Sequence, residues 1–267
     1  MSYLLKHFRV AAAFFNISWK NSIEYMNDFA ILCLDFLVTI ISTIVFWQFL
    51  LPEYENLGGW SMAGLILIGI FGNASWAIGE LFAGAWELSA KITEGRMDKY
   101  MCRPVNTVFS LVLEDMQVEE MIKGMLSLVI LLIWYEIKFH VSAGIVDILF
   151  SFISFLLGIV IVAVTRSIYS CSAFWFENTG GLNYLIHMED LELERYPLDI
   201  FNKATKVVLI SIIPVGFVSC FPAMFYMNMI DNGLLYLLLE IAILGLLVLV
   251  LHLVWGKGIK KYESAGG

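Results

Sequence analysis

Six long apolar stretches constrain the fold of this chain more than any other feature. Each one approaches the roughly 20 apolar residues that a helix needs to span the hydrocarbon core of a bilayer. The third is the shortest, because Lys123 and Glu136 limit its uncharged run to about a dozen residues. Hydrophobic residues make up 60% of the 267 residues, which leaves too little polar sequence to cover six such helices in water. The sequence predicts an all-α, polytopic membrane protein whose six transmembrane helices span Phe29–Leu51, Ser61–Phe82, Met121–Ile137, Ile145–Thr165, Lys206–Met227 and Leu234–Trp255.

The distribution of basic residues predicts the orientation of these helices. If the N-terminus is cytoplasmic, all but one of the 16 Lys and Arg residues fall on the cytoplasmic side, and Lys138 is the exception. Basic residues near the ends of transmembrane helices are enriched on that side. We therefore expect a multi-pass protein of the cell (cytoplasmic) membrane with both termini in the cytoplasm.

The chain is expected to form a single membrane domain over residues 1–267. Its outer loops are short, at about residues 52–60, 138–144 and 228–233, so they leave no room for an extracellular binding domain. Its cytoplasmic segments are longer, at residues 83–119 and 166–205, and a soluble partner is expected to bind there.

The first 28 residues predict an amphipathic N-terminal helix. Its basic side chains Lys6, Arg9 and Lys20 are displaced from an apolar stripe, which is the pattern of a helix that lies in the membrane interface. The alternative is a helix that packs on a partner protein. The stripe consists of Leu4, Leu5, Phe8, Ala12, Phe15 and Trp19.

The sequence lacks the common motifs of nucleotide-binding, hydrolase and metalloprotease sites. It has no GxxxxGK[ST] phosphate loop, no GxSxG, no HExxH and no GxGxxG. Its cysteines have no CxxC spacing, and its histidines are scattered over the arm, two loops and the last span. We expect no enzymatic activity, no cofactor and no metal in this chain.

The candidates for functional acids within the expected spans are Asp35, Glu80 and Glu240. Intramembrane carboxylates often belong to proton relays, although side chains near the ends of a span also reach the headgroup zone. Both interpretations remain open.

Two further patterns concern helix packing. Gly72, Ser75, Gly79 and Ala83 place small side chains at helical spacing, which favours close approach of another helix from the same chain or from a second copy. Pro214 and Pro222, with Gly216 between them, predict either a kinked fifth span or a span followed by a short re-entrant turn.

The segment from Lys91 to Asn106 resembles the signature G-x-x-D-x-x-L-x-R-P-x-N of ABC-2-type permeases. Gly95, Asp98, Arg103, Pro104 and Asn106 match it, and Met101 stands in place of the usual leucine. The remaining similarities follow in the family's order along essentially the whole chain: Ala173-Phe174-Trp175, Arg195-Tyr196-Pro197-Leu198, Pro214 and Phe221-Pro222-Ala223.

This resemblance implies the transmembrane permease subunit of an ATP-driven ABC exporter. Two copies of a separate ATPase subunit would bind ATP and Mg, and a second permease copy or a homologous permease would complete the pathway. The partners are thus these subunits and the lipid bilayer, with no nucleic acid. The alternative for the 91–106 segment is a solvated connector. The residues implied in coupling to the ATPase are Glu94, Gly95, Arg96, Asp98, Lys99, Arg103, Pro104 and Asn106.

The implied substrate pathway runs along the interface of the two permeases, beside spans one, two and five. Its aromatic and small polar lining suits amphipathic or hydrophobic cargo. Two other functions remain open: an ion- or proton-coupled carrier, and a membrane scaffold or immunity protein that transports nothing. The expected lining residues are Phe36, Thr39, Thr43, Trp47, Asn73, Trp76, Phe217 and Phe221.

Overall fold

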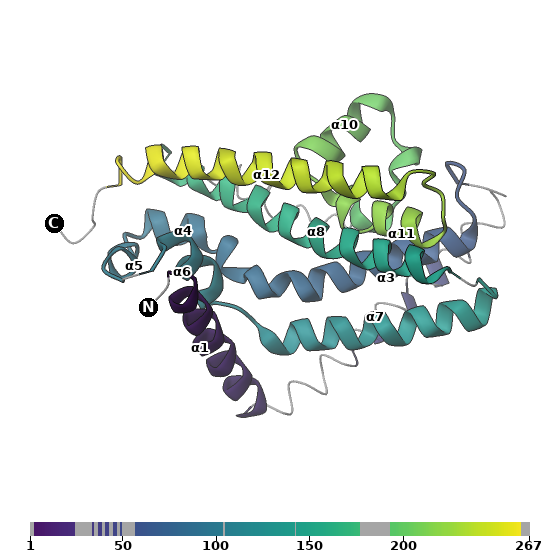
Figure 1. Cartoon of the computed structure of the whole chain (residues 1–267), viewed down its shortest axis with the longest axis horizontal. Coiled ribbons are helices and arrows are strands. Elements are labelled where there is room, and N and C mark those ends of the chain that lie inside the picture. Colours follow the sequence, from purple (N-terminus) through teal and green to yellow (C-terminus); the bar gives the residue numbers. More distant parts are fainter. Residues whose placement is uncertain are drawn as a thin grey trace.

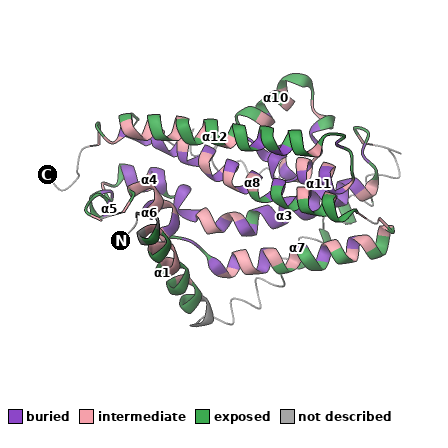
Figure 2. Cartoon of the chain, in the orientation of Figure 1, coloured by how far each residue is buried: buried purple, intermediate pink, exposed green. Residues whose placement is uncertain are grey.

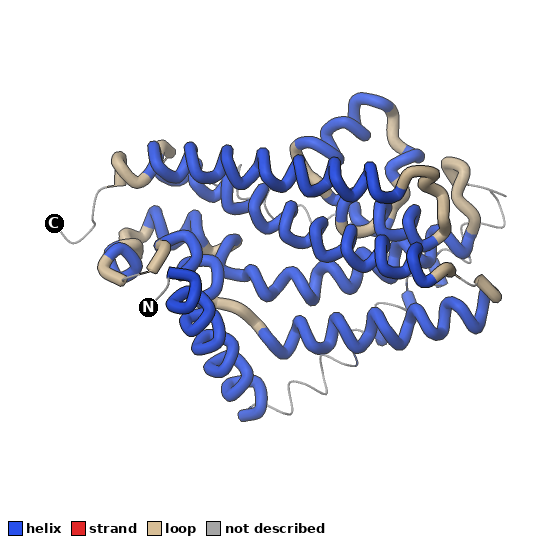
Figure 3. Tube along the Cα trace, in the orientation of Figure 1, coloured by secondary structure: helices blue, strands red, loops and turns tan. Residues whose placement is uncertain are grey.

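The computed structural model describes residues 3–24, 57–103, 105–141, 143–176 and 193–262, together with single positions between 34 and 49. Within this part the chain is helical and has no strand, apart from one isolated bridge between Leu57 and Trp60 (Figure 3). The helices are α1 (Tyr3–Glu24), α3 (Met62–Gly79), η2 (Glu80–Ala85), α4 (Leu88–Thr93), α5 (Asp98–Met101), α6 (Thr107–Glu114), α7 (Val118–Phe139), α8 (Ile145–Ser170), η3 (Cys171–Phe174), η5 (Leu193–Arg195), η6 (Leu198–Ile200), α10 (Lys203–Ser211), η7 (Val215–Phe217), α11 (Cys220–Tyr226) and α12 (Gly233–Gly258).

Helix α3 lies at the centre of the bundle. The Ser61 hydroxyl caps its N-terminus by accepting a hydrogen bond from the Gly64 N–H at 3.3 Å. Helices α7, α8 and α11 all pack against α3, and most of its residues are buried (Figure 2). Large aromatic side chains close the core around it, including Trp60, Phe71, Tyr135 and Phe155.

Three of the described segments are long and apolar enough to cross a membrane. They are Met62–Thr93, Ile145–Phe174 and Gly233–Gly258, and they correspond to the second, fourth and sixth expected spans. The chain is therefore a multi-pass helical membrane protein, but six spans are not confirmed. The expected third span is α7, which does not qualify because charged residues such as Lys123 and Glu136 interrupt it. Most of the expected first span lies outside the described residues.

The expected fifth span is broken. α10 and the segment Val215–Tyr226 meet at an angle of 75°, and together they count as a fourth span only if the bent pair is taken as one. Pro214 lies in the break, where its ring and missing N–H prevent a continuous helix. The bend is much sharper than the gentle curvature of ordinary long helices, so this region is a broken span or a re-entrant loop.

The described part of the segment before α10, residues 193–202, lies along α3 from its middle to its N-terminal end. The Trp60 indole N–H donates a hydrogen bond to Asp199 Oδ2 at 2.9 Å, at the end of α3 that lies away from the 91–106 segment. Glu194 packs against Gly72, in the middle of α3. The sequence placed residues 166–205 in one cytoplasmic loop and Trp60 at an outer loop, whereas the structure brings Asp199 and Trp60 together. The side of the membrane on which this loop lies stays a prediction. Apolar contacts and this hydrogen bond hold the described part of the segment against α3, and charge counting does not detect them.

Helix α1 packs on α6 and α7 through one face only (Figure 1). Ala11 and Phe14 join the cluster around Leu113 and Val118, and the Ser18 hydroxyl accepts a hydrogen bond from the Val118 N–H at 3.0 Å. The other face leaves apolar side chains exposed, as a helix in the membrane interface requires. That interfacial position remains a prediction. The exposed side chains are Leu5, Phe8, Phe15, Ile17 and Trp19.

Candidate functional site

The 91–106 segment forms a block of short helices against the ends of α8 and α12 (Figure 1). Met97 and Tyr100 are buried in one cluster with Phe174 of η3, and Trp255 of α12 packs against the same cluster. Tyr262, beyond α12, also belongs to it, and burial together with the nearby Asp98 charge raises the pKa of its phenol. The segment is thus attached to the membrane helices by a small apolar core.

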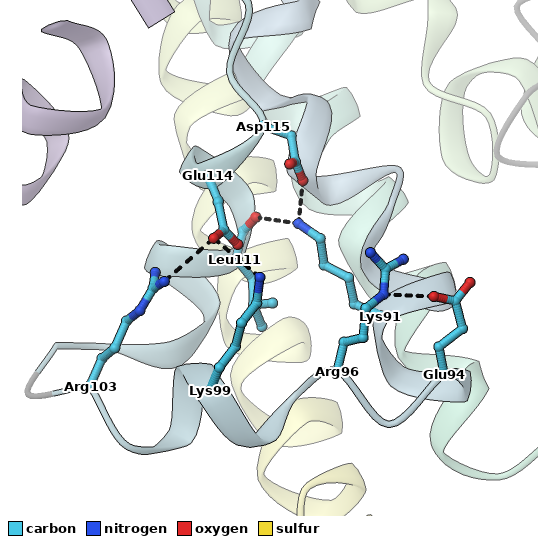
Figure 4. Close-up of polar contacts among 8 residues, drawn as sticks. All are labelled: Lys91, Glu94, Arg96, Lys99, Arg103, Leu111, Glu114 and Asp115. Atoms are coloured by element: carbon cyan, nitrogen blue, oxygen red, sulfur yellow. Dashed lines mark hydrogen bonds and ion pairs between the residues drawn. The ribbon is translucent and has the colours of Figure 1, made fainter. Parts of the chain in front are cut away.

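Lys91 fastens the start of the segment to α6. Its side chain is only 4% exposed, its ammonium group pairs with the Asp115 carboxylate, and it donates to the Leu111 carbonyl oxygen at 3.4 Å (Figure 4). A Cβ atom on Gly84 would lie 2.0 Å from that same carbonyl oxygen, so α6 approaches as closely as glycine permits. Lys91, which the resemblance did not implicate, therefore has a structural role here.

Tyr100 and Glu114 organise the other cations of the segment. The Lys99 ammonium group and the Arg103 guanidinium lie 4.6 and 5.0 Å from the centre of the buried Tyr100 ring. Both also pair with Glu114 Oε1, each at 3.4 Å (Figure 4). Arg103 thus connects the turn after α5 to α6, and it is not a freely solvated side chain.

Glu94 and Arg96 form the outward-facing edge of the segment. Their side chains are 56% and 48% exposed, and Arg96 Nε lies 2.6 Å from Glu94 Oε2 (Figure 4). Gly95 between them has φ +69°, a conformation that glycine adopts without strain. Because both side chains are exposed, their charges are accessible to a partner. An exposed pair of this kind contributes little to stability. Asp98, Lys99 and Met101 are exposed on the same segment.

Asn106 joins the segment to the N-terminal helix. Its side-chain oxygen caps α6 by accepting from the Phe109 N–H at 3.1 Å. Its own backbone N–H donates to His7 Nε2 at 3.2 Å, and the His7 ring lies edge-on to Phe109. No sequence pattern indicated this contact of His7. Pro104 lies outside the described residues.

The expected pathway residues are only partly described. Asn73 and Phe217 are buried, whereas Trp76 is 46% exposed. The Phe217 and Phe221 rings pack against each other with centres 4.9 Å apart. These residues have no common degree of exposure, and their role in a pathway stays a prediction. Phe36, Thr39, Thr43 and Trp47 lie outside the described residues.

Two of the expected intramembrane acids are buried in the bundle. Gln117 Nε2 donates to Glu80 Oε2 at 3.2 Å, and the Ser154 hydroxyl donates to Glu240 Oε1 at 2.8 Å. The carboxylates are 6% and 4% exposed, so neither extends along the outside of the chain. Asp35 lies outside the described residues.

Arg166 is a buried basic residue that the sequence pattern did not reveal. Helix α8 continues to Ser170, beyond the expected end of the span at Thr165, so Arg166 lies in the helix and not in a loop. It is 8% exposed, and its guanidinium lies 4.5 Å from the centre of the Trp86 ring. With Glu194 it lines a cavity of about 40 Å³ between α3, α8 and η7.

Comparison with known families agrees with these observations. Residues 37–266 match the family described as ABC-2 family transporter protein. The chain therefore belongs to this family, as its resemblance to ABC-2-type permeases predicted. Members are membrane subunits that are generally not catalytic themselves and normally work with an ABC ATPase. Searches of curated proteins and of solved structures gave no match.

Proposed function

We propose that this chain is the permease subunit of an ATP-driven ABC exporter of the cell membrane, with both termini in the cytoplasm. It would form half of a translocation pathway together with a second copy or a homologous permease. Two copies of a separate ATPase, which carry the ATP and Mg, would dock on the 91–106 segments. Membership of the ABC-2 family supports the class of protein, and the construction of this segment supports the docking site.

The observation that carries the proposal is the division of the segment into an anchored and an exposed part. Lys91 and Arg103 bind the carboxylates of Asp115 and Glu114 at the end of α6. The charged groups of Glu94 and Arg96 bind each other among the contacts described at this edge. An element that transmits force must be stiff where it joins the membrane helices and must offer complementary charges where it meets its partner. The segment has both properties.

Co-purification tests the docking site directly. The chain would be co-expressed with its ATPase, and complex recovery and ATP hydrolysis would be measured at several salt concentrations. Charge reversal in Asp98→Lys should weaken the complex, and the loss should depend on salt because the charge is exposed. Lys138→Glu is the matched control, since Lys138 is an exposed charge at the far end of α7. Equal recovery of both variants at every salt concentration would contradict the proposal.

A second pair of variants separates docking from transmission. Arg103→Ala removes contacts to Glu114 and Tyr100, so the complex should form while transport-coupled ATP hydrolysis falls. Arg96→Ala leaves those contacts intact and should reduce complex formation instead. If both variants keep full recovery and full coupled hydrolysis, the segment is only a solvated connector.

The buried Ser154–Glu240 and Gln117–Glu80 contacts keep a proton-coupled carrier as the second candidate function. Vesicles depleted of ATP distinguish the two. Flux that follows an imposed proton gradient and needs no ATPase would favour the carrier, whereas flux that requires both ATP and the ATPase would exclude it. The absence of flux under either condition would point to a scaffold.

A further inference from the structure

An apolar groove opens between α6, α8 and α12, next to the 91–106 segment. Its volume is about 370 Å³, and it is lined by residues such as Val112 of α6, Val164 of α8 and Leu251 of α12. Among the lining residues, Asn106, Ser167 and His252 are the polar ones, and none carries a carboxylate, an ammonium or a guanidinium group. The groove is therefore suited to an uncharged, apolar occupant.

The groove continues onto a face that the bilayer must cover. α12 is long and apolar enough to span the membrane, yet only 11% of its apolar window is buried within the chain. Val248, which lines the groove, is 48% exposed, and its neighbour Leu249 is 53% exposed outside the groove. Apolar material that surrounds α12 thus has direct access to the groove.

We propose that this groove binds one acyl chain of a phospholipid, from the leaflet on the side of the 91–106 segment. The groove borders α12, of which only 11% of the apolar window is buried within the chain, so the hydrocarbon around this helix lies next to the opening. An extended hydrocarbon chain is narrow enough to enter. An empty groove would deprive its lining of dispersion contacts, which the neighbouring lipid can supply.

The bound acyl chain would occupy the space between α6 and α12 and contact both helices. α6 carries Glu114, the partner of Arg103, while α12 packs mainly on α8. A lipid tail in contact with both would connect the support of the 91–106 segment to the last transmembrane helix. This site does not depend on ATPase docking, because its lining lies entirely within one chain.

Photolabelling of the full-length chain tests the site. The protein would be placed in phosphatidylcholine vesicles that contain a small fraction of phosphatidylcholine with a diazirine in one acyl chain, and labelled peptides would be mapped by mass spectrometry. Label is expected on residues 107–114 of α6, all of which are at least partly buried and are therefore poorly accessible to lipid elsewhere. Val164→Phe fills the groove and should reduce this label about tenfold, the effect of losing about two methylene contacts.

Two further variants keep the test decisive. Val248→Phe narrows the groove from its exposed rim and should also reduce the α6 label, without a demand on core packing. Leu249→Phe, on the outer face of α12, should leave the label unchanged. The proposal is overturned if α6 is unlabelled in the unmodified chain, or if neither groove variant lowers the label. It is equally overturned if a photoreactive side chain at the position of Val112 crosslinks two protein copies in place of lipid.

Discussion

Helices α3 and α12 are both apolar spans, but their surroundings are opposite. Within the described residues, 72% of the apolar window of Met62–Thr93 is buried inside the chain, against 11% for α12. Figure 2 shows this contrast along the two helices. α3 interleaves Gly, Ala, Ser and Asn with its large side chains, whereas α12 consists mostly of Leu, Ile and Val. In a membrane, small and polar residues indicate which span is central, because hydrophobicity alone does not distinguish lipid from protein.

Truncation of a large side chain should separate the two helices most strongly. Leu67 in α3 is 0% exposed and Leu246 in α12 is 60% exposed. Leu67→Ala leaves a cavity and should cost about 2–5 kcal/mol, whereas Leu246→Ala should cost little. Unfolding in mixed micelles by titration with a denaturing detergent measures both variants. A similar loss of unfolding free energy in both variants would mean that protein covers Leu246 of α12 as it covers Leu67 of α3.

Enlargement of a small residue should have the next largest effect. A Cβ atom on Gly72 would lie 3.0 Å from Glu194, whereas one on Gly245 of α12 meets nothing within 4 Å. Gly72→Leu should therefore push the segment at Leu193–Arg195 away from α3 and cost about 1–3 kcal/mol. Gly245→Leu should leave the free energy of unfolding nearly unchanged, in the same titration. Destabilisation by Gly245→Leu alone would reverse the assignment of buried and exposed helices.

The buried polar contact of α12 offers a smaller test. Ser154→Ala removes the interhelical hydrogen bond to Glu240, and such bonds are worth about 0.6 kcal/mol in membrane proteins. Ser127→Ala is the control, because the Ser127 hydroxyl donates only to the Gly124 carbonyl oxygen of its own helix. Detergent titration should show a loss only in the first variant. A loss of several kcal/mol would show that α12 depends on this contact far more than its exposure suggests.

The contact at the far end of α3 should depend weakly on pH. Burial tends to raise the pKa of Asp199, but hydrogen bonds from Lys206 and Trp60 outweigh it and lower the pKa from 3.8. The stabilisation is therefore complete above pH 3.8 and is lost as the pH falls below it. Because the carboxylate is 39% exposed, we expect a few tenths of a kcal/mol. Trp fluorescence during unfolding should show this dependence, and Asp199→Asn should abolish it.

The sequence predicted the helical membrane class and the family, because these depend on long apolar runs and on a local motif. It did not predict that Asp199 returns to Trp60, since that contact depends on the path of the chain between spans and not on charge. It also placed Arg166 in a loop, because the local change from apolar to basic residues does not reveal that α8 continues to Ser170 or that Trp86, 80 positions earlier, contacts Arg166.

Within the candidate site, the sequence could indicate which residues are charged, but not which of them are exposed and which are held by contacts with other helices. Glu94 and Arg96 could be proposed for docking from charge alone, and the structure leaves both exposed. The bracing of Arg103 by Glu114 and Tyr100 joins residues from different helices, so no spacing in the motif encodes it. Lys91 was overlooked for the same reason, since Asp115 lies 24 positions away.

The hydrogen bond between Trp60 and Asp199 also has a consequence for biogenesis. The two residues are separated by 139 positions, so at ordinary elongation rates the indole is synthesised about 7–28 s before its acceptor. During that interval the Ser61 cap of α3 can already form, but the Trp60 indole lacks its acceptor. Insertion factors can therefore reach the surface around Trp60 during synthesis, before Asp199 contacts it in the complete chain.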